Sequence, residues 1–195
     1  MATEASICNM ALARIQVKQA IGSLTDETPV ARLCTRFYEQ TRQALLREFP
    51  WPFCEQYYTL ALVETQPNAR WGYSYRYPTG ALRINDVVSE QRIPDQKIPF
   101  KIGSDSQGRL IYTDDEDAVI AANTDISDTS QMDPLFVDAF AWRMAVELSA
   151  PLSESTEVTN YANVKYEQAI RRAMSVAMNE DSPDEYEGGL MRARE

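Results

Sequence analysis

Apolar positions recur at helical spacing between residues 28 and 49. The apolar members are Val30, Leu33, Cys34, Phe37, Ala44, Leu45 and Phe49, and the opposite face carries Arg32, Arg36, Glu39, Arg42 and Glu48. Thr28 is suited to cap the N-terminus, and Pro29 fits the first helical position, where a backbone N–H has no partner in any case. The pattern predicts one long helix that buries one face and presents the other to water or to a neighbouring subunit.

The long helix is predicted to end near Phe49, where an aromatic corner begins. The corner consists of Pro50, Trp51, Pro52 and Phe53. Proline restricts its own backbone and that of the preceding residue, so the two prolines fix the chain where the helical period changes to alternation. Trp51 and Phe53 are large enough to fill a core at such a bend. We therefore expect the corner to be a structural site.

Three further helices are predicted from the same kind of pattern. The first spans Thr3–Lys18, with Thr3 as its cap. Asp133 caps a third helix that ends at Ala150-Pro151 and is apolar round more than half its circumference, which favours a central position. Ser153 is predicted to cap a fourth helix that extends to about Met178.

Residues 54–132 favour strands and turns instead. The predicted strands are Tyr57–Leu62, Trp71–Tyr77, Leu82–Val88, Phe100–Ile102, Arg109–Thr113 and Ala118–Asn123, with turns or loops at Gln66–Asn68, Ser89–Pro99, Gly103–Gly108 and Thr124–Met132. The sequence therefore predicts an α+β fold, with a helical core of about four helices from both chain ends and an inserted antiparallel β subdomain. The helical core covers residues 1–53 and 133–178, the β subdomain 54–132, and a flexible C-terminal arm 179–195.

One predicted strand carries Trp71, Tyr73, Tyr75 and Tyr77 at a spacing of two residues. In an extended chain these four side chains face the same side. Such aromatic stripes usually pack in a core or at a subunit contact, so the stripe is a candidate interface. Sugars and single-stranded nucleic acids also stack on aromatic faces, and a ligand platform is therefore the alternative.

The chain is strongly acidic, with 19 basic and 29 acidic residues and a net charge of −10. Residues 1–50 hold six basic and five acidic groups, which leaves 13 basic and 24 acidic groups for the remainder. Affinity for duplex DNA comes largely from Lys and Arg that neutralise phosphates, so the composition argues against a DNA-binding function. A wall that repels phosphate is nevertheless compatible with a channel through which DNA slides.

The residue types exclude several classes of site. The chain has no histidine, and Cys8, Cys34 and Cys54 lie far apart in apolar surroundings. This composition removes the usual structural zinc sites and the Ser-His and Cys-His catalytic arrangements, and it predicts buried, reduced thiols. We expect no cofactor. We also expect no signal peptide and no membrane partner, because no apolar run is long enough to span a bilayer, and hence assembly in the cytoplasm.

Two groups of carboxylates are candidates for chemistry. Asp114, Asp115, Glu116 and Asp117 are consecutive, and Glu55 lies beside the aromatic corner. The run lacks the glycine and glutamate positions of a calcium-binding loop, so a solvated turn is expected in place of a metal site. A glycosidase needs two carboxyl groups held across a cleft, and neither candidate has a visible acid/base partner. We therefore predict no catalytic and no metal-binding residue.

The C-terminal arm changes composition along its length. Five acidic groups between Glu180 and Glu187, followed by Gly188 and Gly189, predict disorder when the chain is free. The glycines are followed by a small apolar anchor and two cations: Leu190, Met191, Arg192 and Arg194. Such a segment is suited to insertion into a groove on another subunit, and a solvated terminus without a partner is the alternative.

Together these segments resemble the tail tubular protein A family, the head-to-tail adaptors of short-tailed (podoviral) bacteriophages. The resemblance rests on an ordered series: Cys8–Ile15, Ser23-Leu24, Pro50–Phe53, Trp71–Pro78 and Ala150-Pro151-Leu152. It extends roughly over residues 7–177. The chain departs from the family pattern at Gln16, where a glycine is expected after the first helix. It departs again at Thr79-Gly80-Ala81, which replaces a more usual acidic residue.

The resemblance implies a structural virion protein and not an enzyme. Members of this family form a twelve-subunit ring below the portal protein, hold the tail nozzle (tail tubular protein B) and the tail fibres, and line the channel through which genome DNA passes without specific binding. The implied location is the virion tail, assembled in the host cytoplasm, and the C-terminal arm becomes a candidate portal-docking arm. The alternative is a glycan or peptidoglycan hydrolase of the phage tail, because such cleavage has been attributed to some relatives of this adaptor type. A nucleic-acid-binding module on the aromatic stripe is disfavoured by the net charge.

Overall fold

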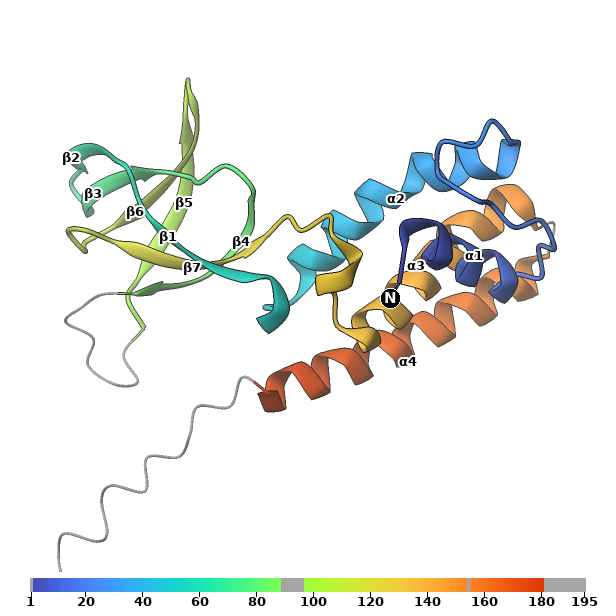
Figure 1. Ribbon diagram of the computed structural model, residues 1–195. Coiled ribbons are helices and arrows are strands. Elements are labelled where there is room, and N and C mark those ends of the chain that lie inside the picture. Colours follow the sequence, from blue (N-terminus) through green and yellow to red (C-terminus); the bar gives the residue numbers. More distant parts are fainter. Residues whose placement is uncertain (1, 89–96, 154, 181–195) are drawn as a thin grey trace, which may run out of the picture.

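The helices occupy one end of the molecule and the strands the other (Figure 1). The computed structural model describes residues 2–88, 97–153 and 155–180. Within these residues the helices are α1 (Glu4–Arg14), α2 (Pro29–Glu48), α3 (Pro134–Leu152) and α4 (Thr156–Glu180). The strands lie between α2 and α3 along the chain and form two antiparallel sheets, which confirms the predicted α+β fold.

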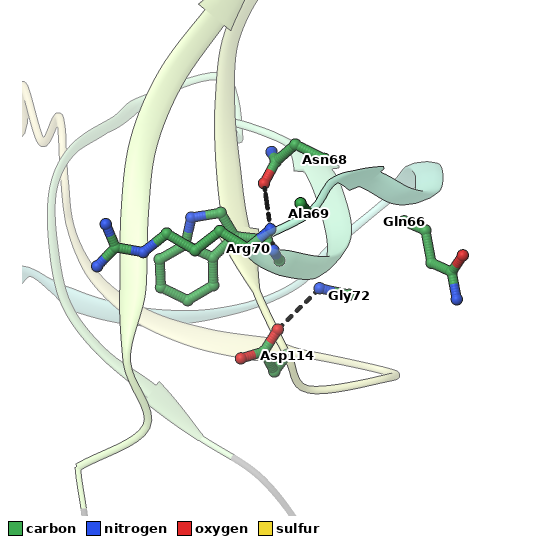
Figure 2. Close-up of a pocket in the computed structure, with 7 residues that line it drawn as sticks. Gln66, Asn68, Ala69, Arg70, Gly72 and Asp114 are labelled. Atoms are coloured by element: carbon green, nitrogen blue, oxygen red, sulfur yellow. Dashed lines mark hydrogen bonds between the residues drawn. The ribbon is translucent and has the colours of Figure 1, made fainter.

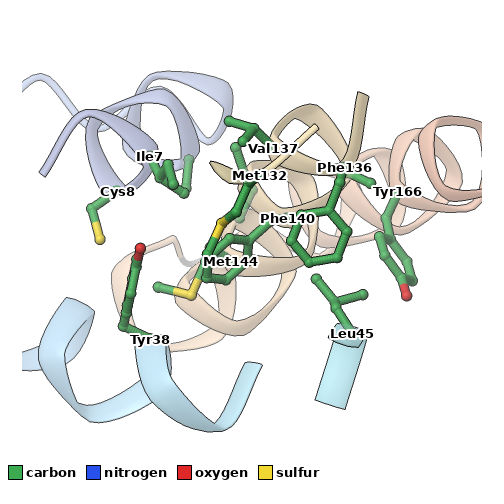
Figure 3. Packing of buried hydrophobic residues seen from close by; sticks show 14 of the residues in the cluster. Ile7, Cys8, Tyr38, Leu45, Met132, Phe136, Val137, Phe140, Met144 and Tyr166 are labelled. Carbon is green, nitrogen blue, oxygen red and sulfur yellow. The ribbon is translucent and has the colours of Figure 1, made fainter. Parts of the chain in front are cut away.

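α3 lies at the centre of the helical end, as its nearly continuous apolar surface predicts. It packs against α1, α2 and α4. Asp133 Oδ1 accepts hydrogen bonds from the N–H groups of Leu135 and Phe136, so the predicted cap is present. Figure 3 shows the core around this helix, where the ring centroids of Phe140 and Tyr38 of α2 lie 5.0 Å apart.

α1 ends at Arg14 and not at the predicted Lys18. Gln16 adopts the left-handed conformation, with φ of 64°, and its N–H donates to the Ala13 carbonyl at 3.1 Å. The Val17 N–H donates to the Leu12 carbonyl at 3.0 Å. These two bonds form a Schellman motif, which ends a helix and usually has glycine at the left-handed position. The turn that a glycine was expected to make is therefore present, with glutamine in a conformation unfavourable for it.

The boundary between α3 and α4 lies later than predicted. α3 continues through Pro151 to Leu152, although proline has no N–H to donate to the carbonyl four residues earlier. Ser153 is the C-cap of α3, and its N–H donates to the Ser149 carbonyl at 2.8 Å. The prediction that Ser153 caps the fourth helix is therefore wrong, and α4 extends from Thr156 beyond Met178 to Glu180.

Each sheet includes strand pairs that are distant in the sequence, β1 with β7 in one and β3 with β6 in the other. The strands are β1 (Glu55–Thr59), β2 (Leu62–Asn68), β3 (Trp71–Arg76), β4 (Ala81–Val88), β5 (Phe100–Asp105), β6 (Gly108–Thr113) and β7 (Val119–Thr124). One sheet has the order β1-β7-β4 and the other β2-β3-β6-β5. Buried residues of both sheets, including Tyr75, Ile84, Ile111 and Ile120, form a hydrophobic cluster separate from that of the helices.

The predicted strand Tyr57–Leu62 is in fact parts of two strands. β1 ends at Thr59, and β2 begins at Leu62 in the other sheet. β2 also contains Pro67, where a turn was predicted. This is possible because β2 is an edge strand, in which a missing N–H need not break the ladder, and because its register shifts beside Gln66. The turn lies instead at Ala69-Arg70.

The hairpin predicted around residues 103–108 is present with longer strands. Asp105 pairs with Gly108 across the two residues Ser106-Gln107. Gly108 has φ of 135°, which glycine adopts without the cost that a side chain would add. The loop predicted at Ser89–Pro99 lies largely outside the described residues.

Candidate interaction surfaces

The aromatic corner lies inside the molecule, between α2 and α3. Trp51 is 1% exposed, and its Nε1–H donates to the Leu45 carbonyl at 2.8 Å. Its ring centroid lies 5.0 Å from that of Phe49 and 5.1 Å from that of Phe136, both in edge contacts. Of the other corner residues, Pro50 and Phe53 are half-buried and Pro52 is exposed. The corner is thus the connection between the end of α2 and the start of β1, and its tryptophan is fixed in the core.

Side chains of the β sheets bind the carbonyl groups at the end of α2. Asn123 of β7 is fully buried and donates from Nδ2 to the Leu46 carbonyl at 2.6 Å and the Phe49 carbonyl at 2.5 Å. Its Oδ1 accepts from Asn85 Nδ2 at 2.8 Å, and Arg83 donates to the Glu48 carbonyl at 2.7 Å. The last carbonyls of a helix lack partners within the helix, so these contacts join α2 to β4 and β7. We call Arg83, Asn85, Asn123 and the carbonyls that they hold the polar junction.

Arg42 lies close to this junction, and the prediction that it faces water or a neighbouring subunit is wrong. It is 3% exposed, with Nη1 donating to Asp125 Oδ1 at 2.6 Å and to the Ile126 carbonyl, and Nη2 to Glu39 Oε2 at 2.5 Å. Burial opposes the charge, but the Glu39 and Asp125 carboxylates together hold the pKa of Arg42 above its usual value. The other residues predicted on this face, Arg32, Arg36, Glu39 and Glu48, are exposed as expected. Arg42 alone among them is covered, because α2 also contacts β4 and β7.

The aromatic stripe divides between core and surface. Tyr75 and Tyr77 are buried in the cluster of the β sheets, and Tyr73 packs at its edge. The Tyr75 hydroxyl donates to the Asp115 carbonyl at 2.9 Å. Trp71 is half-buried at the β2–β3 turn and is not part of that cluster. The stripe therefore does not present four open ring faces to one ligand.

An open hollow of about 650 Å³ lies beside Trp71 (Figure 2). Asn68 Oδ1 accepts hydrogen bonds from the N–H groups of Arg70 and Trp71, which fixes the turn, and Asp114 Oδ1 accepts from the Gly72 N–H at 2.7 Å. The guanidinium carbon of Arg70 lies 5.4 Å from the centre of the Trp71 ring. A cation over one ring face competes with a stacked sugar or base for that face. The hollow therefore favours a protein contact over a stacking ligand.

The acidic turn, Asp114–Asp117, is fixed by hydrogen bonds to residues of β3. Asp114 binds the Gly72 N–H and the Asp115 carbonyl binds Tyr75, whereas the side chains of Glu116 and Asp117 are exposed. Within the part of the chain that the structure describes, no three Asp, Glu or Cys side chains converge as metal ligands do. Glu55, the other candidate carboxylate, accepts from Asn85 Nδ2 at 2.9 Å and thus has a structural partner beside the polar junction.

One surface that sequence reasoning did not find crosses α1, α3 and α4. The guanidinium carbon of Arg14 lies 4.2 Å from the Trp142 ring centre, and the ring centroids of Trp142 and Tyr161 lie 6.0 Å apart. Lys165 Nζ lies 5.5 Å from the Tyr161 ring centre, and Val164 beside it is 55% exposed. We call these five residues the cation–aromatic patch. The spacing of four residues between Tyr161 and Lys165 indicates that they share one helix face, which the sequence could have shown. Arg14 and Trp142 come next to them only through the fold.

The three cysteines are buried free thiols, as predicted. A hydrogen bond between Cys8 and Cys34, together with burial, raises the pKa of Cys8. Burial raises the pKa of Cys54 to about 12. The raised pKa values make Cys8 and Cys54 unsuited to act as nucleophiles. The hydrogen bond with Cys8 lowers the pKa of Cys34, but Cys34 is fully buried.

The remaining candidate residues lie outside the residues that the structure describes. The arm residues Gly188, Gly189, Leu190, Met191, Arg192 and Arg194 lie beyond Glu180, where the described residues end. Among the helices that the structure describes, none has both the length and the apolar character needed to cross a bilayer. Comparison of the sequence with protein-family models and with curated proteins finds no match.

Proposed function

We propose that this protein is a structural subunit of a phage tail, a head-to-tail adaptor that joins the portal to the tail nozzle and fibres. In this role, copies of the chain form a ring around the path of the genome, twelve copies in the proteins that the sequence resembles. The ring belongs to the virion tail and is assembled in the host cytoplasm. The proposal rests on the resemblance over Cys8–Ile15, Pro50–Phe53 and Trp71–Pro78.

One observation of the structure carries the proposal: large apolar side chains are exposed at both ends of a tightly connected molecule. Tyr57 and Leu62 at the β end are 67% and 53% exposed, and Tyr161 and Val164 at the helical end are 53% and 55% exposed. Grouped apolar side chains on a surface mark contacts with other proteins. A subunit that contacts different neighbours through its two ends suits an adaptor, whereas an enzyme needs convergent polar groups in a pocket.

The net charge of −10 is compatible with this role. Acidic side chains repel the phosphate groups of DNA, so a ring of such subunits offers the genome a channel with little adhesion. The genome therefore passes through the ring without specific binding.

The arm from Gly188 to Arg194 is the candidate contact with the portal. Its apolar pair Leu190-Met191 and its two arginines form an anchor suited to a groove on another protein. Deleting residues 188–195 is expected to leave the melting temperature of the free chain unchanged and to weaken its attachment to the portal. Wild-type occupancy by the truncated chain would show that the arm is dispensable.

Electron microscopy of the chain mixed with a candidate portal tests the function itself. The expected result is ring-shaped density on one end of the portal, and portals without added density would contradict the proposal. A parallel assay with purified glycan strands tests the hydrolase alternative. Release of soluble glycan that is lost in Glu55→Gln, but retained in the matched exposed variant Glu157→Gln, would favour the hydrolase.

A further inference from the structure

We propose that the cation–aromatic patch of one copy binds the acidic turn of a second copy, as the lateral contact of the ring. The inference rests on the proposed function in one respect, that the copies form a ring. The contact between two copies is argued from the residues of this chain alone. The patch is Arg14, Trp142, Tyr161, Val164 and Lys165, and the turn is Asp114–Asp117.

The patch has the composition of a binding surface. Trp, Tyr and Arg are the residue types that dominate the energetics of protein interfaces. Here one of each lies in a continuous row, since Arg14 stacks on Trp142 and Trp142 contacts Tyr161 edge-on. Tyr161 and Val164 add apolar surface that is more than half exposed. A partner that covers this row removes aromatic and aliphatic area from water.

The patch is also held in place before it binds. Arg14 donates from Nη1 to the Asp138 carbonyl at 2.9 Å, and its Nη2 contacts the Asp138 carboxylate. Trp142 is packed between Arg14 and Tyr161. Binding therefore orders few side chains, which lowers the entropic cost of association.

Opposite charge identifies the occupant. The patch presents the ammonium group of Lys165, beside Arg14, whose charge is shared with Asp138, so an acidic partner surface is favoured. The acidic turn places four carboxylates in consecutive positions, and Glu116 and Asp117 are exposed. The strands hold this turn through the bonds of Asp114 to Gly72 and of Asp115 to Tyr75. Two surfaces that are both fixed and opposite in charge fit each other at low ordering cost.

The positions of the two surfaces are compatible with a ring. The turn belongs to the β end of the molecule and the patch to the helical end (Figure 1). A contact between two different surfaces of the same chain is heterologous, and such contacts form a ring when the rotation from copy to copy closes. A two-fold dimer would instead need one self-complementary surface.

Photo-crosslinking tests which segments meet. Val164 is replaced by benzoylphenylalanine in the full chain. Equal amounts of light and ¹⁵N-labelled chain are mixed at high protein concentration, where copies that associate only weakly still meet, and irradiated at low salt. The expected product joins position 164 of one copy to the peptide containing Asp114–Asp117 of another. Crosslinks between copies only to other segments, including residues 181–187, would overturn the proposal, as would no product above that from the same replacement at Met178. Met178 is a suitable control because it is also exposed but lies near the C-terminal end of α4, away from the patch.

Charge reversal tests the chemistry of the contact. Lys165→Glu and Glu116→Lys are each expected to lower the yield of the crosslink between copies by roughly tenfold, and the two changes in one chain are expected to restore it. Lys101→Glu changes the net charge by the same amount at an exposed site on β5 and is expected to have little effect. Equal losses of crosslink yield from Lys165→Glu and Lys101→Glu would show that net charge alone determines association, and the proposed contact would be wrong.

The two proposals fail in different ways. If Lys165→Glu decorates portals at wild-type occupancy in closed rings, the lateral contact is wrong and the adaptor function stands. If the chain never binds portals but the expected crosslink and its rescue appear, the contact stands and the adaptor function is wrong.

Discussion

Trp51 and Asn123 hold the same end of α2 by different means. Trp51 fills the space between α2 and α3 and donates to the Leu45 carbonyl, whereas Asn123 donates to the next free carbonyls of the helix, those of Leu46 and Phe49. One residue contributes mainly apolar area and the other contributes only hydrogen bonds. Their substitution therefore tests two separate causes of stability at one place.

Trp51→Ala is expected to lower the free energy of unfolding by about 3–5 kcal/mol, because it removes a fully buried aromatic ring and leaves a cavity. Denaturant titration followed by circular dichroism measures the loss. Trp71→Ala is the matched control, since Trp71 is half-buried at a turn, and its cost is expected to stay within about 1 kcal/mol. Equal losses for the two variants would mean that the corner is not a special site.

Asn123→Asp is expected to cost about 2–4 kcal/mol, because the carboxylate cannot donate to the Leu46 and Phe49 carbonyls and adds negative charge at a helix C-terminus. The same change at Asn68 is the control. Asn68 uses only its Oδ1 as an acceptor, a role that a carboxylate fills as well, so Asn68→Asp is expected to be nearly neutral. Similar melting temperatures for the two variants would argue against the polar junction.

The cysteines are expected to resist alkylation in the folded chain. Iodoacetamide reacts with the thiolate, and a raised pKa of about 12 keeps Cys54 protonated at pH 8.5, where an unfolded thiol is already partly ionised. Cys8 and Cys34 are fully buried. Mass spectrometry should show no added label under native conditions and three labels after unfolding in guanidinium. Rapid labelling of any one thiol in the native chain would place it at an accessible site.

At the scale of helices and strands, most helix caps were predicted correctly, with Ser153 the exception, whereas strand pairing was not predicted. The caps Thr28 and Asp133 were predicted because a cap depends only on residues within one helical turn. The break at Leu60-Ala61 was missed because β1 pairs with β7, some sixty residues later, and β2 pairs with β3 in the other sheet. No local pattern distinguishes a strand that continues from one that changes sheets.

The same reason explains the errors in the candidate sites. Arg42 was assigned to water or a neighbouring subunit because the pattern of one helix does not show that β4 and β7 approach α2 on its polar face. The cation–aromatic patch was missed because it combines residues 14, 142 and 161–165 from three helices. In contrast, burial of Trp51 follows from a local feature, the two prolines that fix the chain on either side of it.

The end of α1 offers a test of conformational strain. Gln16→Gly is expected to raise the free energy of unfolding by about 0.5–1 kcal/mol, because glycine adopts the left-handed conformation without steric cost. Gln19→Gly is the control at an exposed position whose φ is not positive, where glycine is expected to give no gain. A gain of the same size in both variants would mean that the left-handed turn is not the cause.

At the scale of the whole molecule, charge governs association. The free chain is expected to be monomeric or weakly associated at low micromolar concentration, because subunits with a net charge of −10 repel one another. A portal offsets this repulsion by holding several copies close together, so closed rings are expected only on the portal. Native mass spectrometry of the chain alone checks this, and stable rings without a portal would contradict it.

The polar junction has a mechanical consequence for the molecule. A hinge needs a few residues that absorb backbone rotation, but the path from α2 to β1 contains two prolines and a buried tryptophan. The return path from β7 is tied to α2 through Asn123 and Asp125. Bending the sheets against α2 would therefore break several hydrogen bonds together. A force on the sheets is therefore passed to α2 with little bending at Phe49, and the subunit resists deformation as one stiff body.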